Sequence, residues 1–267
     1  MAPPVVALHG ITSNGRAWDA VARELDGDVR LLTPDLRGRG DAGQEPGPYG
    51  LARHVQDTVD LLDAEGLDSA VVAGHSMGAY VAALLAARHP DRVASVVLVD
   101  GGPPLPVPDG ADPDALLEAT LGPSIERLAK EFPDREAYHE FWRVHPAFAG
   151  YDVADGDLVA YADHDLRGEP PHLRSSVAEQ AVRTDGRELI ADHDVRTALE
   201  TMRVPGTLLR AERGLLDQPE AFIPKEMAAA FDHPTVTLRE VPGTNHFTIL
   251  MGAAGAAVVA EEIRARL

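Results

Sequence analysis

The stretch Gly74-His75-Ser76-Met77-Gly78 stands between an apolar run, Ala70 to Ala73, and a segment with helical spacing, Ala79 to Arg88. An apolar run followed at once by a helical pattern predicts a strand that turns sharply into a helix, with Ser76 at the turn. Glycine two positions either side of the serine suits such a turn, because a side chain there would collide with neighbouring backbone. The stretch therefore predicts a strand, turn and helix unit of an α/β sheet.

A serine on such a turn, a nucleophile elbow, presents its hydroxyl to whatever lies above the strand end. The backbone N–H of Met77, at the start of the helix, points toward the place where an oxyanion would form. Ser76 is therefore the candidate nucleophile, and Met77 is a candidate oxyanion donor.

Composition limits the classes of protein to consider. A chain of 267 residues with 45% hydrophobic content can form one large α/β domain, or a core with an inserted subdomain. The sequence has no cysteine, which excludes disulfides, a thiolate nucleophile and cysteine-ligated metal. A formal charge of −19 repels nucleic-acid phosphates and anionic lipids, so we expect neither nucleic acid nor membrane as a partner.

The start of the chain, Met1 to Pro4, enters an apolar run without the basic flank and long apolar stretch of a secretory signal. No uninterrupted apolar segment reaches the roughly 18 to 20 residues of a membrane-spanning helix. We expect a soluble, cytoplasmic protein.

Apolar runs that suit buried parallel strands alternate with helical patterns, which predicts an α/β fold with a mostly parallel sheet of about six strands flanked by helices. The predicted strands are Pro4 to Leu8, Val29 to Thr33, Ala70 to Ala73, Val93 to Val99, Gly206 to Arg210 and Val236 to Val241; the predicted helices are Ala17 to Leu25, Leu51 to Gly66, Ala79 to His89 and Ala253 to Leu267.

The alternation stops after a proline-rich segment that begins at Pro103, and it resumes after Met202. We therefore predict a core of residues 1–102 and 203–267 with a helical cap inserted at 103–202 and without good strands. The helices expected in the cap are Asp114 to Phe132, Arg135 to Val144, Asp157 to Leu166, Ser175 to Thr184 and Val195 to Met202. Sheets of this kind bind ligands beyond the carboxyl ends of their strands, so the cap is expected to roof the site and set its specificity.

A serine hydroxyl needs a base within hydrogen-bond reach and a third group that orients the base. His246 is the candidate base, because it follows the last predicted strand and precedes the final helix, in a loop expected beside the elbow.

Four motifs together resemble the α/β-hydrolase superfamily, in its capped, esterase-like or lipase-like form. They are His9-Gly10-Ile11, Asp35-Leu36-Arg37-Gly38-Arg39-Gly40, the Ser76 elbow and Asn245-His246. The resemblance implies that the N–H of Ile11 is the second oxyanion donor and that Asp35 and Arg37 shape a turn near the site. Members usually carry a hairpin before the first strand here; without it, the trimmed sheet has an exposed edge that a second copy can cover, as a homodimer.

The triad acid is the open assignment. The family's usual acid follows the penultimate strand, where alignment from Pro205 puts Gly214. We expect Asp100 in its place, because it ends a predicted strand and a strand end is a rigid mount, and some members of the superfamily place their acid there. Asp217 is the alternative acid, and Glu212 is a third candidate.

For the substrate, the aromatic residues Trp18, Tyr80 and Phe247 of the core and Trp142 of the cap are candidates for an apolar pocket, although ordinary core packing suits them equally. We expect no cofactor and no metal; the repeated Ala-Asp-His-Asp at residues 162–165 and 191–194 is read as solvated helix ends.

These residues predict a serine hydrolase that cleaves a small apolar carboxylic ester or lactone through an acyl-enzyme. Hydrolysis of amide or carbon–carbon bonds uses the same residues and stays open. A different class of function, capture of a small ligand with little turnover, is the alternative that the missing acid at Gly214 keeps open.

Overall fold

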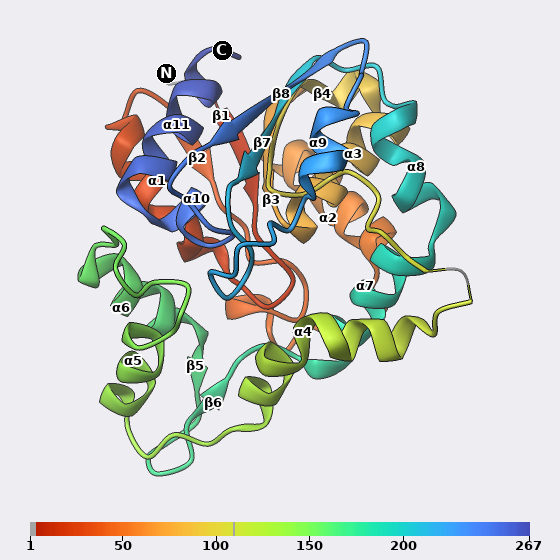
Figure 1. The fold of residues 1–267 in the computed structure, drawn as a ribbon. Helices are drawn as coiled ribbons and strands as arrows, with labels where there is room; N and C mark the ends of the chain where they lie inside the picture. Colours follow the sequence, from red (N-terminus) through yellow and green to blue (C-terminus); the bar gives the residue numbers. More distant parts are fainter. Residues whose placement is uncertain (1–3, 109) are drawn as a thin grey trace.

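The computed structural model describes residues 4–108 and 110–267, and it has at its centre a twisted parallel sheet (Figure 1). Among the described residues six strands form this sheet, in the order β2-β1-β3-β4-β7-β8, so β2 and β8 are its edges. The predicted fold class is confirmed. The strands are β1 (Pro4–Leu8), β2 (Arg30–Leu32), β3 (Ala70–His75), β4 (Val93–Val99), β7 (Gly206–Ala211) and β8 (Val236–Val241).

Side chains along each central strand alternate between two cores, because successive residues of a strand point to opposite faces. On β1, Val6 and Leu8 belong to one core, and Val5 and Ala7 belong to the other. Both faces are thus covered, which explains why these strands are continuous apolar runs in the sequence.

Helices cover the two faces as separate layers (Figure 1). The first face is covered by α2 (Leu51–Ala64), α3 (Met77–Arg88) and α8 (His193–Thr201), and the second by α1 (Asp19–Leu25), α10 (Thr248–Met251) and α11 (Ala253–Arg264). The short helix α9 (Lys225–Ala229) joins β7 to β8. Three short 3₁₀ helices among the described residues are η1 (Gly15–Trp18), η2 (Gly40–Ala42) and η3 (Pro90–Arg92).

The remaining helices gather beyond one end of the sheet, and we call α4 to α7 the cap helices (Figure 1). They are α4 (Pro113–Ala129), α5 (Arg135–Arg143), α6 (Asp155–Asp165) and α7 (Glu179–Ala191). The last helix of the expected insertion, α8, packs instead on α3 in the core. Asp192 caps α8, its side chain accepting the N–H of Val195, so the helix begins earlier than expected.

The expectation that residues 103–202 hold no strand is wrong. A short antiparallel hairpin of β5 (Leu166–Arg167) and β6 (Arg174–Ser175) lies between α6 and α7. Ser175, expected to begin a helix, lies in β6, and its hydroxyl donates to Asp165 at 2.8 Å. The helix α7 therefore begins at Glu179, four residues later than expected.

Candidate functional site

Ser76 stands at the sharp turn between β3 and α3, with φ 54° and ψ −122°. L-residues rarely adopt this backbone conformation, which costs of order 1–3 kcal/mol and persists only where the surroundings impose it. The N–H of Ser76 donates to the carbonyl of Val99 at 2.9 Å, which ties the turn to the end of β4. The turn that the Gly-x-Ser-x-Gly motif predicts is present.

The glycines around Ser76 allow three stretches of backbone to meet. A Cβ at Gly74 would lie 2.2 Å from the carbonyl oxygen of Gly78, and a Cβ at Gly78 would lie 2.2 Å from that of Leu8. A Cβ at Gly101 would lie 2.4 Å from the carbonyl oxygen of Ser76. A side chain at Gly74 would distort the elbow itself, one at Gly78 would push the elbow away from β1, and one at Gly101 would push it away from the segment after β4.

His246 follows β8 and is paired with Asp100, which follows β4. The Nδ1–H of His246 donates to Oδ2 of Asp100 at 2.7 Å, and Oδ1 of Asp100 accepts the N–H of Ala211 at 3.0 Å. The carboxylate is fully buried. Because a carboxylate only accepts, this bond places the proton of a neutral His246 ring on Nδ1 and its lone pair on Nε2. His246 and Ser76 line the same small cavity, of about 30 Å³.

Asp217, the alternative acid, has other partners. Its Oδ1 accepts from Tyr151 Oη at 2.5 Å, from Arg213 Nε at 2.8 Å and from Asn245 Nδ2 at 3.2 Å. Burial works against ionisation of Asp217, but these hydrogen bonds outweigh it and lower the pKa of the carboxyl group. The structure does not join Asp217 to His246.

The two other positions considered for the acid are also accounted for. Glu212 accepts the N–H of Gly243 at 2.8 Å. At Gly214 a Cβ would lie 2.4 Å from the carbonyl oxygen of Glu220, so the backbone leaves no room there for an acidic side chain.

The candidate oxyanion donors lie on two sides of Ser76. Met77 is the first residue of α3, and the N–H groups of a first helical turn have no intrahelical acceptor. Ile11 follows β1, in a loop that we call the β1 loop (residues 9–14). Ile11 and Ser76 both line the small cavity.

A larger cavity, of about 190 Å³, begins at Ser76 and runs between the cap helices α4 and α7; we call it the apolar cavity. Its described lining holds no charged side chain. The residues that line it are Ile11, Ser76, Leu105, Pro106, Leu116, Leu117, Thr120, Leu121, Gly186, Leu189, Ile190, Leu215 and Phe222.

Of the aromatic residues expected to form the pocket, Phe247 lines the small cavity, and the other three line neither cavity. Trp18 is fully buried in the core, Tyr80 donates its hydroxyl to Pro103 O at 2.7 Å, and Trp142 lies under the guanidinium of Arg127 at 5.1 Å. Sequence reasoning missed the leucines of α4 and α7, for which the only signal is a helical apolar spacing that core residues share.

Two further histidines near Ser76 are buried as neutral rings. Nδ1–H of His9 donates to Gly10 O at 2.8 Å while its Nε2 accepts the N–H of Leu36 at 2.9 Å. Nε2–H of His75 donates to His246 O at 2.7 Å. Burial lowers the pKa of His9 to about 4 and that of His75 to about 3. Both rings brace the backbone around the site.

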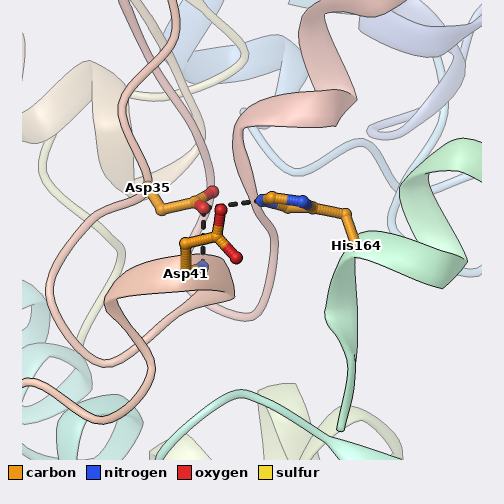
Figure 2. A group of neighbouring side chains, drawn as sticks. All are labelled: Asp35, Asp41 and His164. Carbon is orange, nitrogen blue, oxygen red and sulfur yellow. Dashed lines mark hydrogen bonds and ion pairs between the residues drawn. The ribbon is translucent and has the colours of Figure 1, made fainter.

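Asp35, Asp41 and His164 form a polar cluster where the turn after β2 meets α6 (Figure 2). Oδ2 of Asp35 accepts from His164 Nε2 at 2.6 Å and from the N–H of Asp41 at 2.8 Å, while Oδ1 accepts the N–H of Gly15 at 2.8 Å. Burial raises the pKa of Asp35, but these hydrogen bonds outweigh it and lower the pKa. Asp35 thus connects η1, which directly follows the β1 loop, with the turn after β2 and the cap.

Arg37, expected to be structural like Asp35, forms a two-pronged ion pair with Asp57 of α2, at 3.0 and 3.1 Å.

Over residues 4–108 and 110–267, no helix is both long enough and apolar enough to cross a membrane.

Comparison with known proteins agrees with this fold. Residues 3–135 match the family model described as the alpha/beta hydrolase fold. Lipase LipV of Mycobacterium tuberculosis is 37% identical over 117 residues, which are 44% of this chain and 43% of that protein. The matched region therefore spans less than half the length of that relative.

Solved structures resemble the chain over nearly its whole length. E-2-(acetamidomethylene)succinate hydrolase superposes with a TM-score of 0.80 at 21% identity, over 98% of this chain and 91% of that one. N-formylmaleamic acid deformylase of Pseudomonas putida superposes with a TM-score of 0.71 at 22% identity, over 98% and 92% of the two chains. These likenesses concern the fold.

Proposed function

This chain belongs to the α/β-hydrolase superfamily, and on that premise we propose that it is a serine hydrolase of small apolar carboxylic esters or lactones. Ser76 is the nucleophile, His246 the base and Asp100 the acid that orients the base. The observation that carries the proposal is the 2.7 Å bond from His246 to the buried Asp100, beside a cavity that Ser76 and His246 share.

In the proposed reaction, Oγ of Ser76 attacks the ester carbonyl while its proton passes to Nε2 of His246. The N–H groups of Ile11 and Met77 stabilise the resulting oxyanion. Collapse of the tetrahedral intermediate breaks the ester bond, and the leaving alkoxide takes the proton back from His246. Water, deprotonated by His246, then attacks the acyl-enzyme and releases the acid with free Ser76.

The apolar cavity supports an uncharged acyl group. An apolar cavity of roughly 150 Å³ holds benzene, so about 190 Å³ suits an aromatic ring or a short alkyl chain. Two structural relatives are named for acting on a succinate derivative and on an N-formylmaleamic acid. A free carboxylate placed in the apolar cavity of this chain would meet no charged partner among its lining residues.

Amide hydrolysis is the second candidate. It needs the same nucleophile, base and oxyanion donors, and the name of one structural relative, a deformylase of N-formylmaleamic acid, supports keeping it. Offering neutral amides beside the esters separates the two, since an amide hydrolase must also protonate an amine leaving group.

The test compares two p-nitrophenyl esters that share a leaving group, the neutral hexanoate and the anionic hemisuccinate. We expect kcat/KM for the hemisuccinate to be at least about a hundredfold lower, because an unpaired buried charge costs several kcal/mol. Leu189→Arg, which adds a cation to the cavity wall, should reduce the difference in kcat/KM between the two esters. Equal turnover of both esters, or full turnover by Ser76→Ala, would contradict the proposal.

A further inference from the structure

In the β1 loop, the peptide group between Gly10 and Ile11 is held in a fixed orientation. Gly10 O accepts from His9 Nδ1 at 2.8 Å and from the N–H of Ser13 at 3.2 Å. A trans peptide is planar, and its N–H points opposite to its carbonyl. Fixing the carbonyl of Gly10 therefore fixes the direction of the Ile11 N–H, provided that the rest of the loop stays in place.

A buried arginine holds the next peptide group, between Ile11 and Thr12. Nε of Arg39, a fully buried side chain, donates to Ile11 O at 2.9 Å, and its Nη1 lies 2.6 Å from Oδ2 of Asp185 on α7. Asp185 also accepts from His54 at 3.0 Å and from the N–H of Gly50 at 2.8 Å. Burial raises the pKa of Asp185, but Arg39 and His54 outweigh it, so the pKa is lowered and the carboxylate stays charged.

A second buried arginine, from the cap, holds the peptide group between Thr12 and Ser13. Nη2 of Arg127 on α4 donates to Thr12 O at 2.9 Å, and its Nη1 donates to Oδ2 of Asp165 on α6 at 2.5 Å. The hydroxyl of Tyr138 on α5 contacts both charges. Arg127 and Asp165 are each 2% exposed. Three successive carbonyls of the β1 loop are thus held, two of them by arginines.

Both arginines use the same geometry, with one arm of the guanidinium on a loop carbonyl and the other on a buried aspartate of the cap. Arginine can do this because its donors form a rigid fork, whereas the single ammonium of lysine cannot span both acceptors. The aspartates come from α6 and α7, so the position of the loop depends on how the cap helices sit. Asp35, which joins Gly15 to His164, adds a third link between the cap and this region (Figure 2).

We propose that Arg39 and Arg127 are positioning residues, which hold the β1 loop so that the N–H of Ile11 faces the reacting carbonyl when the cap helices are packed as in this structure. The inference rests on the proposed function, in which Ile11 is an oxyanion donor. A loop free to shift by about 1 Å would lose much of the rate enhancement, because an oxyanion donor acts only when it is placed before the charge develops.

The test compares Arg127→Lys with Tyr138→Phe. Lysine keeps a cation beside Asp165 but gives up the bond to Thr12 O, whereas phenylalanine removes a partner of the same ion pair and leaves that bond intact. Two readouts are taken on both proteins and on wild type: kcat and KM for p-nitrophenyl hexanoate, and hydrogen exchange of the backbone amides of residues 10–14.

For Arg127→Lys we expect kcat to fall at least about tenfold with KM changed less than about twofold, because the lost stabilisation belongs to the transition state. Loop exchange should rise at least about tenfold. Tyr138→Phe should lower thermal stability while kcat and loop exchange stay near wild type. If Arg127→Lys does not fold, Arg39→Lys is measured in the same way.

Equal kcat losses in the two variants, or loop exchange unchanged in the lysine variant, would overturn the inference. A failure of the proposed function looks different: wild type would turn over no ester. The exchange measurement would then still decide whether the arginines hold the loop.

Discussion

Asp100→Asn is the substitution that isolates the orientation of His246. Oδ1 of Asp100 accepts the N–H of Ala211 and Oδ2 accepts Nδ1–H of His246, so both oxygens are acceptors. An asparagine of the same shape has one acceptor oxygen and one donor NH₂ group. If its oxygen stays on Ala211, its NH₂ faces His246, and the ring must then carry its proton on Nε2.

The expected size of the effect follows from that change of tautomer. A histidine protonated on Nε2 cannot take the proton of Ser76, so only the minor population with the correct tautomer reacts. Replacing the acid of a serine triad in this way lowers kcat by about 10⁴-fold. The fold should survive, because the substitution is isosteric and one of the two hydrogen bonds is kept.

The assay is kcat for p-nitrophenyl hexanoate, with Asp217→Asn as the matched control. Asp217 bonds to Tyr151, Arg213 and Asn245 and makes no bond to His246, so we expect its variant to stay within about tenfold of wild type. Loss of kcat in Asp217→Asn together with an active Asp100→Asn would refute the assignment of the acid.

Two further predictions concern stability. Gly78→Ala should destabilise the fold by at least about 2 kcal/mol, because its Cβ would lie 2.2 Å from Leu8 O. The control, Gly156→Ala on α6, places its Cβ in open space and should be neutral or stabilising. Urea unfolding midpoints measure both variants, and equal midpoints would contradict the close packing of the elbow against β1. The folded-state pKa values of His9 and His75 are lowered to about 4 and about 3, so below about pH 6.5 the unfolded chain binds protons that the folded chain does not. The free energy of unfolding should therefore fall as the pH drops from about 6.5 to about 4, by up to about 1.4 kcal/mol per pH unit for each histidine, and His75→Asn should remove one histidine's share. A free energy that stays constant between about pH 7 and about pH 5 would mean that these rings are not buried as neutral groups.

The parts of the molecule that the sequence predicts well depend on local signals. The elbow is visible because backbone meets backbone at Gly74 and Gly78, and only glycine allows it. The six strands are visible because a sheet covered on both faces needs continuous apolar runs. Asp100 is visible as a candidate because it ends such a run, although the pattern alone leaves Asp217 open.

The parts that the sequence hides depend on distant partners. Arg127 and Asp165 lie 38 residues apart, and nothing near either residue indicates that they meet. Asp165 belongs to an Asp-rich repeat and was therefore expected in solvent, whereas it is buried; burial works against its charge, but Arg127 and hydrogen bonds outweigh burial and lower its pKa.

The lining of the apolar cavity was hidden for a similar reason. The aromatic residues of α5 and α6 pack on one another, with ring centres of Trp142 and Tyr161 5.2 Å apart, and leave the cavity wall to leucines of α4 and α7. Which face of a cap helix lines a cavity depends on how that helix docks, and helical spacing alone does not determine docking.

The most direct test of the central claim, that Ser76 is an activated nucleophile, is intact mass after incubation with a fluorophosphonate, run on wild type, Ser76→Ala and Asp100→Asn. We expect one adduct on wild type, no adduct on Ser76→Ala and much slower labelling of Asp100→Asn. Wild type that stays unmodified, or an adduct that forms equally on Ser76→Ala, would mean that Ser76 is not an activated nucleophile.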